Sequence, residues 1–373
     1  MSNGETIISF VTSARHWAMG VFRLPAAGIV YFAAVVASTQ FGSGAKAEIA
    51  DHFPGAEWES VDATASGWSV DKLKDAETWS QDIGTTALMV VRHGSIVGQW
   101  GDVAAKTPLA SVRKSFLSAL YGNAVARGEI DLKQNLAQLG IDDNEPSLSV
   151  EEKTATVRDL LEARSGVYHA ALYETPSMAM RRPPRHSHPP GTFWYYNNWD
   201  FNTLGAIYEH AARHSIFDAL ETEISEPIGM QDYQTSDGQY VTGAASVYPA
   251  YPINMSARDL ARFGLLYLHK GKWRDRRVVP SSWVEESTRS YSEAVYASGY
   301  GFLWWIGMPR NPLSVWTTAT EPSGCFFALG YGGQLAFVSP AYDLVVVRRG
   351  LAGAPGQLDR LLRMLFDAGH LGS

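Results

Sequence analysis

The sequence predicts an α+β fold in which a mostly antiparallel sheet, flanked by terminal helices, is interrupted by an inserted helical subdomain. Strand-like runs lie near both ends of the chain, at residues 85–102 and from residue 298 onward, whereas helical patterns dominate residues 130–285. A sheet built from both ends of a chain is discontinuous in sequence. We therefore expect a sheet part at about residues 70–115 and 290–373 and a helical part at about residues 116–289.

The composition is that of a globular enzyme with one large or two closely packed domains. The chain has 373 residues, of which 46% are apolar and 18% are charged, so it is not a disordered chain. Its 31 basic and 38 acidic residues form no Lys/Arg stripe, and we expect no nucleic-acid partner. Cys325 is the only cysteine, which excludes an intrachain disulfide, and its apolar surroundings favour a structural role.

The N-terminal segment predicts export. Residues 24–38 are uncharged and mostly apolar, follow two arginines, and are shorter than the roughly 20 residues that span a membrane. The small-residue site Ala45-Lys46-Ala47 follows, so residues 1–47 are predicted to be a signal peptide and residues 48–373 the folded domain. The protein would then be periplasmic or secreted. An uncleaved membrane anchor and a buried helix are the alternatives.

The first elements follow from local signals. Ser69 is a plausible N-cap for a helix over residues 70–83. Two β-rich runs flank His93-Gly94, which predicts a hairpin. Residues 111–128 then form a strongly helical, apolar segment that ends near a glycine.

The later elements follow the same rules. Helices are predicted within residues 156–166, 254–273, 280–288 and 356–371. Strands are predicted within residues 298–308 and 325–330, and on both sides of the turn at residues 340–343.

The strongest chemical signal is Ser111-Val112-Arg113-Lys114 at a predicted helix start. Residues three apart share a helix face, so Lys114 can lie beside the Ser111 hydroxyl and act as its base if burial lowers its pKa. The N–H groups of the helix start suit a developing oxyanion. Ser69-x-x-Lys72 has the same spacing, but its helix is charged, and we interpret Ser69 as a cap.

A second motif supplies a phenol and an amide. Pro190-Gly191-Thr192 is followed by Tyr196 and Asn198. The phenol could relay a proton to the leaving group, and the amide could orient the lysine or the acyl carbonyl. Tyr195 and Asn197 have the same spacing, so the residues alone do not distinguish the two pairs.

Together with Gly330-Tyr331-Gly332-Gly333-Gln334, these ordered motifs resemble the class C β-lactamase and penicillin-binding-protein group of serine hydrolases. The resemblance covers about residues 70–370, and SVRKSF and SGVYH are similar to 6-aminohexanoate-dimer hydrolases and related esterases. It implies a β-lactamase/transpeptidase-like fold. It also implies Ser111 as nucleophile, Lys114 as base and the Tyr196–Asn198 pair as their partners.

The third motif departs from the family pattern. Members that cleave penicillins or D-Ala-D-Ala carry Lys-Thr-Gly where this chain has Tyr331-Gly332-Gly333, and Tyr331 offers no cation for a substrate carboxylate. The resemblance implies that Gln334 N–H and Ser111 N–H form the oxyanion hole, supported by Gly333. Tyr331 is expected to contact substrate.

Other residues near the motifs are weaker candidates. In the family, Tyr168 and His169 would border the cleft, and we expect them to contact substrate or to pack. His186 and His188 could bind a metal, but a proline-stiffened loop at the cleft rim is favoured. Trp304 and Trp305 alternate along a strand, so one is expected in the core and the other at the site.

The sequence therefore predicts a serine hydrolase that cleaves an ester or amide of a small molecule through an acyl-enzyme on Ser111. No dinucleotide fingerprint or phosphate loop is visible, so no cofactor is expected, and no metal is expected either. One alternative is a β-lactamase or D-Ala-D-Ala carboxypeptidase. Another is a non-catalytic binding protein on the same scaffold. Membrane contact, if any, would come from residues 24–38, and the oligomeric state is left open.

Overall fold

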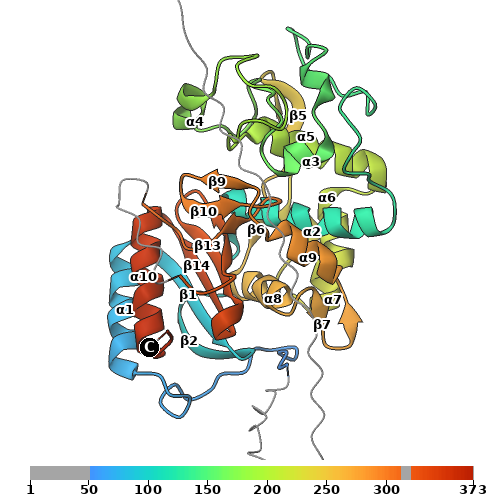
Figure 1. The fold of residues 1–373 in the computed structure, drawn as a ribbon. Coiled ribbons are helices and arrows are strands. Elements are labelled where there is room, and N and C mark those ends of the chain that lie inside the picture. The colour runs from blue at the N-terminus through green and yellow to red at the C-terminus, as the bar shows by residue number, and fades with distance from the viewer. Residues whose placement is uncertain (1–50, 312–320, 373) are drawn as a thin grey trace, which may run out of the picture. The chain divides into compact units, whose positions relative to one another are not determined.

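The computed structural model describes residues 51–311 and 321–372 (Figure 1). Residues Ile49–Ser373 form one compact unit. The predicted leader, residues 1–47, lies outside the described residues. Among the described residues, no helix combines the length and the apolar character that crossing a membrane requires.

One eight-stranded sheet dominates this unit, with the order β2-β1-β14-β13-β12-β11-β10-β9 and antiparallel neighbours throughout. The N-terminal hairpin joins the C-terminal strands where β1 pairs with β14, with Val90 opposite Val346. The predicted α+β fold with a discontinuous antiparallel sheet is thus confirmed. The sheet strands are β1 (Thr85–Arg92), β2 (Ser95–Gly101), β9 (Ser292–Ala294), β10 (Ala297–Tyr300), β11 (Trp305–Ile306), β12 (Phe326–Gly330), β13 (Gln334–Ser339) and β14 (Leu344–Gly350).

Within residues 51–311 and 321–372, three short strand pairs lie outside this sheet. They are β3 (Thr107–Pro108) with β6 (Asn254–Met255), β4 (Val241–Gly243) with β5 (Ser246–Ala250), and β7 (Lys272–Trp273) with β8 (Arg276–Arg277).

The α-helices are α1 (Val70–Asp82), α2 (Arg113–Ala126), α3 (Val157–Leu161), α4 (Pro176–Arg181), α5 (Asn198–Ala212), α6 (Ile216–Ala219), α7 (Glu226–Ile228), α8 (Ala257–Leu268), α9 (Ser281–Ser287) and α10 (Pro355–Ala368). Short helical turns of other types are η1 (Ala110–Val112), η2 (Glu152–Thr154), η3 (Leu220–Ser225), η4 (Thr235–Asp237) and η6 (Pro340–Tyr342).

The predicted turns form as their residues require. His93 and Gly94, between β1 and β2, have φ of 50° and 74°, the two positive values that a tight type I′ hairpin needs. The second predicted turn, η6, ends at Asp343 with φ of 48° and connects β13 to β14. Ser69 caps α1 as predicted, because its hydroxyl accepts a hydrogen bond from Lys72 N.

Helices cover the two faces of the sheet (Figure 1). Phe337 on β13 contacts Phe366 of α10, which packs beside α1. Val345 on β14 approaches Gly264 of α8. Phe337 lies opposite Val346, so its side chain and that of Val345 point to opposite faces. Helix α8 lies within the range predicted for the helical part, but it covers the sheet, and Gly264 lets it approach β14 closely.

Gly264→Ala should destabilise the protein although alanine favours helices. An added Cβ would lie 2.6 Å from Val345 Cγ1, and a valine cannot turn away easily. Overpacking of about 1–3 kcal/mol should outweigh a helix-propensity gain of about 1 kcal/mol. Urea unfolding of Gly264→Ala should show a net loss of up to about 2 kcal/mol in the otherwise wild-type protein but none in a Val345→Ala background. An equal loss in both backgrounds would contradict this packing.

Candidate active site

The chain reaches Ser111 through a short, well-anchored strand. Thr107 and Pro108 pair with β6, and Leu109 N donates to Ile253 O at 2.9 Å. Ala110 then adopts a left-handed φ of 49°, which is costly for alanine and turns the chain into η1 and α2. Ser111 thus lies at the start of a long helix, as predicted.

Lys114 and Ser111 are in direct contact. Lys114 Nζ lies 2.6 Å from Ser111 Oγ, and the lysine is only 1% exposed. The rings of Tyr196 and Phe201 each lie 4.9 Å from Nζ. Burial, and then the charge of Arg113, lower the pKa of Lys114 well below its usual range. The environment therefore favours an uncharged amine beside the hydroxyl.

The second Ser-x-x-Lys match has no such environment. The Lys72 side chain is 42% exposed, and its Nζ lies 2.9 Å from a carboxylate oxygen of Asp367. Lys72 is thus neither removed from water nor placed beside the Ser69 hydroxyl in the way that Lys114 is placed beside Ser111. This difference, rather than the spacing, separates Ser111 from Ser69.

Tyr196 completes a cluster of three. Its ring lies 4.9 Å from Lys114 Nζ. Burial raises the pKa of Tyr196 to about 12, against the opposing effects of the Ser111 hydroxyl and of Arg113. The phenol is therefore protonated at neutral pH and able to donate. Trp305 stacks on the Tyr196 ring at 5.2 Å. Trp304 packs against Phe263 and Tyr267 in the core, and Trp305 is also buried.

The side chains of the neighbouring pair, Tyr195 and Asn197, stabilise the fold through hydrogen bonds to the backbone. Tyr195 Oη donates to Met178 O at 2.9 Å. Asn197 is the N-cap of α5, where its Oδ1 accepts from Trp199 N, and its Nδ2 donates to Val167 O at 2.7 Å. Both side chains are thus engaged by the backbone.

Asn198, the first residue of α5, is less fully engaged. Its Nδ2 donates to Tyr173 O at 2.6 Å, whereas its buried Oδ1 has no hydrogen-bond partner among the described residues. A buried amide oxygen without a donor is uncommon. Asn198 therefore has an unused acceptor, and its role toward Lys114 or substrate stays a prediction.

The end of β12 lies against the turn that carries Ser111. A Cβ added to Gly330 would lie 2.5 Å from Leu109 O and 3.1 Å from Ala110 Cβ, so only glycine fits. β12 pairs with β11 only through Phe326 and Phe327. The edge of β12 beyond these residues therefore has no strand partner among the described residues.

Gln334 lies across the hairpin from Gly330, at the start of β13. Its Oε1 accepts from Arg349 Nε at 2.8 Å, and its Nε2 donates to Gly350 O. The same arginine donates from Nη1 to Met255 O and from Nη2 to Thr107 O. The buried Arg349 thus joins the hairpin to the strand that leads to Ser111.

Gly333 and Tyr331 differ in their surroundings. Gly333 has a φ of 75°, and its carbonyl accepts from Nη1 of the buried Arg348 at 2.7 Å. Tyr331 is 81% exposed, so its side chain lies at the surface. Tyr331 therefore remains a candidate for substrate contact.

Tyr168 and His169 lie on the segment that precedes α4. Tyr168 is 5% exposed, and its hydroxyl lies 3.2 Å from Nδ1 of His188. His169 lies beside the Trp199 ring, and its Nε2 is buried without a partner among the described residues. Substrate contact by either residue stays a prediction.

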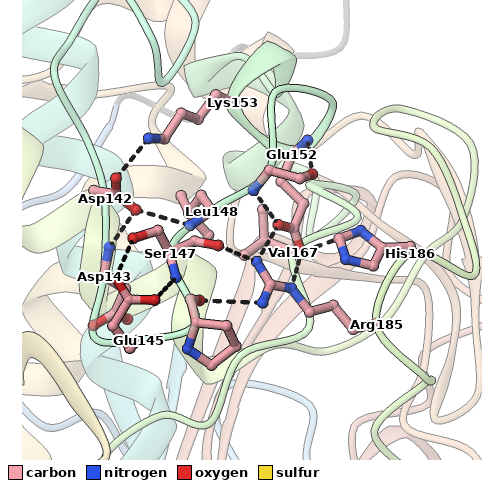
Figure 2. A network of polar contacts seen from close by, with 12 residues as sticks. Asp142, Asp143, Glu145, Ser147, Leu148, Glu152, Lys153, Val167, Arg185 and His186 are labelled. Atoms are coloured by element: carbon pink, nitrogen blue, oxygen red, sulfur yellow. Dashed lines mark hydrogen bonds and ion pairs between the residues drawn. The ribbon is translucent and has the colours of Figure 1, made fainter.

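His186 and His188 belong to a loop that is held by distant acidic residues. Figure 2 shows Arg185 paired with Glu152, with Nη2–Oε2 at 2.8 Å, and His186 Nδ1 at 3.9 Å from Glu152 Oε1. His188 stacks on Phe193. Glu152 is far from this loop in the sequence, so the sequence alone could not reveal its contacts with Arg185 and His186. Across the described residues, no group of three or more His, Cys, Asp or Glu side chains is placed to hold a metal.

Two residues near the site were not singled out from the sequence. Arg113 interrupts an apolar helix start, and Arg349 belongs to the arginine pair in the otherwise apolar strand β14. The sequence did contain a signal for both residues, because each is a charged residue among apolar neighbours that predict a buried position. Both residues are 2% exposed or less.

The two asparagines can be separated by mutation. Asn197→Ala removes a helix cap and a buried donor, so we expect a loss of about 2–3 kcal/mol in the free energy of unfolding. Asn198→Ala removes one bond to Tyr173 O and should cost about 1 kcal/mol. Chemical denaturation of both variants checks this order, and a reversed order would contradict the assignment of Asn197 to the fold.

Comparisons with known proteins agree with the fold of this chain. A Bacillus anthracis protein classed with 6-aminohexanoate-dimer hydrolases has a TM-score of 0.63 and 22% identity, covering 85% of this chain and 89% of its own. A β-lactamase from Mycobacterium bovis has a TM-score of 0.57 and 20% identity, covering 80% and 100%. An uncharacterized protein of Alkalihalophilus pseudofirmus is 24% identical over 258 residues, covering 64% of this chain and 72% of its own. The family profile described as "Beta-lactamase" matches residues 70–348, and the chain therefore belongs to the β-lactamase family of serine hydrolases.

Proposed function

We propose that this protein is a cofactor-free hydrolase that cleaves small-molecule esters or amides through an acyl-enzyme on Ser111. The observation that carries the proposal is the 2.6 Å contact between Ser111 Oγ and the buried Lys114 Nζ. A serine hydroxyl becomes a nucleophile only when a base takes its proton, and an uncharged amine at this distance can do so.

The reaction would proceed in two halves. Ser111 Oγ attacks the substrate carbonyl while its proton passes to Lys114. Tyr196 donates its phenol proton to the leaving oxygen or nitrogen as the scissile bond breaks, and Lys114 returns a proton to Tyr196. A water molecule then attacks the acyl-enzyme, giving its proton to the same groups, and the acid product leaves Ser111 with its hydroxyl restored.

For the oxyanion hole we propose Ser111 N–H and Tyr331 N–H, which replaces the assignment to Gln334. Gly330 O accepts from Gly333 N at 3.0 Å within the hairpin, so the backbone groups of Gly330 point toward β13. Backbone groups of successive strand residues alternate between edges. Tyr331 N–H therefore belongs to the open edge beside Ser111, whereas Gln334, paired with Gly330, lies inside the sheet.

Tyr331→Pro tests this assignment without removing the turn. Gly332 has φ of 79°, which makes Tyr331 the second residue of a type II-like turn, a position that proline favours. The proline removes the N–H, so kcat for a short ester should fall by about 10²–10³-fold. Tyr331→Ala keeps the N–H and should retain most of the activity. Equal activity of Tyr331→Pro and Tyr331→Ala would instead favour Gln334 N–H as the second donor of the oxyanion hole.

The substrate class follows from what surrounds this edge. Residues 326–333, at the end of β12 and in its turn, contain no Lys, Arg or His, so no cation there could bind a substrate carboxylate. This favours esters and amides without a carboxylate beside the scissile bond. It disfavours penicillins and D-Ala-D-Ala peptides.

Ser111→Ala should abolish turnover of short p-nitrophenyl esters, because the nucleophile is lost. Ser69→Ala is the matched control, since it removes the hydroxyl of the other Ser-x-x-Lys match and should leave turnover intact. Undiminished activity of Ser111→Ala would refute the proposal. Steady hydrolysis of nitrocefin by the wild-type protein would instead favour a β-lactamase. Failure of a fluorophosphonate probe to label Ser111 would favour a binding protein.

A further inference from the structure

Arg113 is a buried cation two residues after the candidate nucleophile, Ser111. It is the first residue of α2 and is 2% exposed. Its Nη1 donates to Ala110 O at 2.8 Å, and its Cζ lies 4.9 Å from the centre of the buried Tyr251 ring. Its Nε and Nη2 are buried without a hydrogen-bond partner among the described residues.

This placement is unfavourable for stability on three counts. A buried cation normally pairs with a carboxylate, and no ion pair of Arg113 occurs among the described residues. The start of a helix carries positive partial charge, which repels a cation. The next residue, Lys114, is itself cationic when protonated. Arg349, equally buried, instead donates to three backbone carbonyls and to Gln334.

We propose that Arg113 acts through Lys114, and that its uncompensated positive charge keeps the Lys114 amine unprotonated and available as a base. The proposal rests on the proposed function, in which Lys114 accepts the Ser111 proton. Two like charges on adjacent residues in a poorly hydrated site repel strongly, and only Lys114 can relieve the repulsion by losing its proton.

The other groups around Lys114 do not offset this charge. Tyr196 approaches from the segment before α5, and Tyr300 comes from β10; burial raises the pKa of both phenols, so both are neutral. Burial likewise raises the pKa of Tyr251. Asp200 on α5 is bound by Ser165, and burial raises the pKa of its carboxyl well above the usual range.

Arg113 is therefore the one charged group that acts on Lys114 among these neighbours. After burial, its charge is the second cause that lowers the pKa of Lys114. The same charge also lowers the pKa of Tyr196, so it favours negative charge at the site. A single buried cation thus disfavours the ammonium form of the base and favours the anionic transition state.

The pH profile of kcat/KM for p-nitrophenyl acetate tests the proposal. Arg113→Met removes the charge and keeps an unbranched, flexible side chain that is shorter than arginine, and Arg113→Lys retains the charge. Without the charge Lys114 holds its proton to higher pH, so the acidic limb of the Arg113→Met profile should move to higher pH. Activity should then return on the alkaline plateau. The Arg113→Lys profile should stay close to wild type.

A purely structural role predicts a different result. Activity of Arg113→Met would then fall by the same factor at every pH, together with its melting temperature, and the limb would stay in place. Arg262→Met controls for loss of a buried arginine, because Arg262 binds carbonyls of Ile228, Gly55 and Ala56 rather than groups of the site. The acidic limb of the Arg262→Met pH profile should not move.

Direct titration of Lys114 separates this inference from the proposed function. NMR of protein labelled with [ε-¹³C]lysine, assigned with Lys114→Arg, follows the amine without turnover. The titration midpoint of Lys114 should rise in Arg113→Met, or in Arg113→Gln if the methionine variant does not fold. An unchanged midpoint overturns the inference even if Ser111 proves to be the nucleophile. A raised midpoint supports the effect of Arg113 on Lys114 even if Ser111→Ala keeps its activity, a result that would refute only the role of Lys114 as the base for Ser111.

Discussion

Removal of the Lys114 amine from water is the constraint on which the candidate site depends. A protonated amine buried to 1% exposure without a carboxylate is strongly disfavoured, so the fold sets the protonation state of the group beside Ser111. That burial requires both parts of the molecule. Phe201 comes from the helical part, whereas Trp305, which stacks on Tyr196, comes from the sheet. The candidate site therefore takes neighbouring aromatic residues from both α5 and β11.

Buried arginines hold the two sides of this junction together. The turn after β12 and the strand before Ser111 leave backbone carbonyls that no ladder satisfies, and buried carbonyls need donors. Arg348 supplies donors to Gly332 and Gly333, and Arg349 supplies them to Thr107 and Pro108. A guanidinium suits this task because its five N–H groups point in fixed directions. Arg113 differs, since it is buried but makes a single bond, to Ala110 O.

The family assignment fixes the fold more firmly than the substrate. Neighbours at 20–22% identity share the fold with this chain, and one fold can support different reactions. The proposed ester or amide substrate therefore depends on the site itself, where Ser111, Lys114 and Tyr196 lie together beside a strand edge without a cation.

Local features of this protein could be predicted from the sequence by itself. The cap at Ser69, the turn at His93-Gly94 and the approach of Lys114 to Ser111 depend on residues a few positions apart, and backbone geometry alone determines such relations. The discontinuous sheet was also predictable, because strand patterns occur at both ends of the chain.

Only the tertiary structure decided the relations between distant residues. It placed α8 on the sheet, brought Glu152 to the loop of His186, and left the edge of β12 open beside Ser111. Arg113 and Gln334 are visible in the sequence, but the sequence does not reveal the direction in which their side chains and backbone groups point. Burial and strand pairing are set by contacts across more than a hundred residues, such as Arg349 with Thr107, and no local pattern records them.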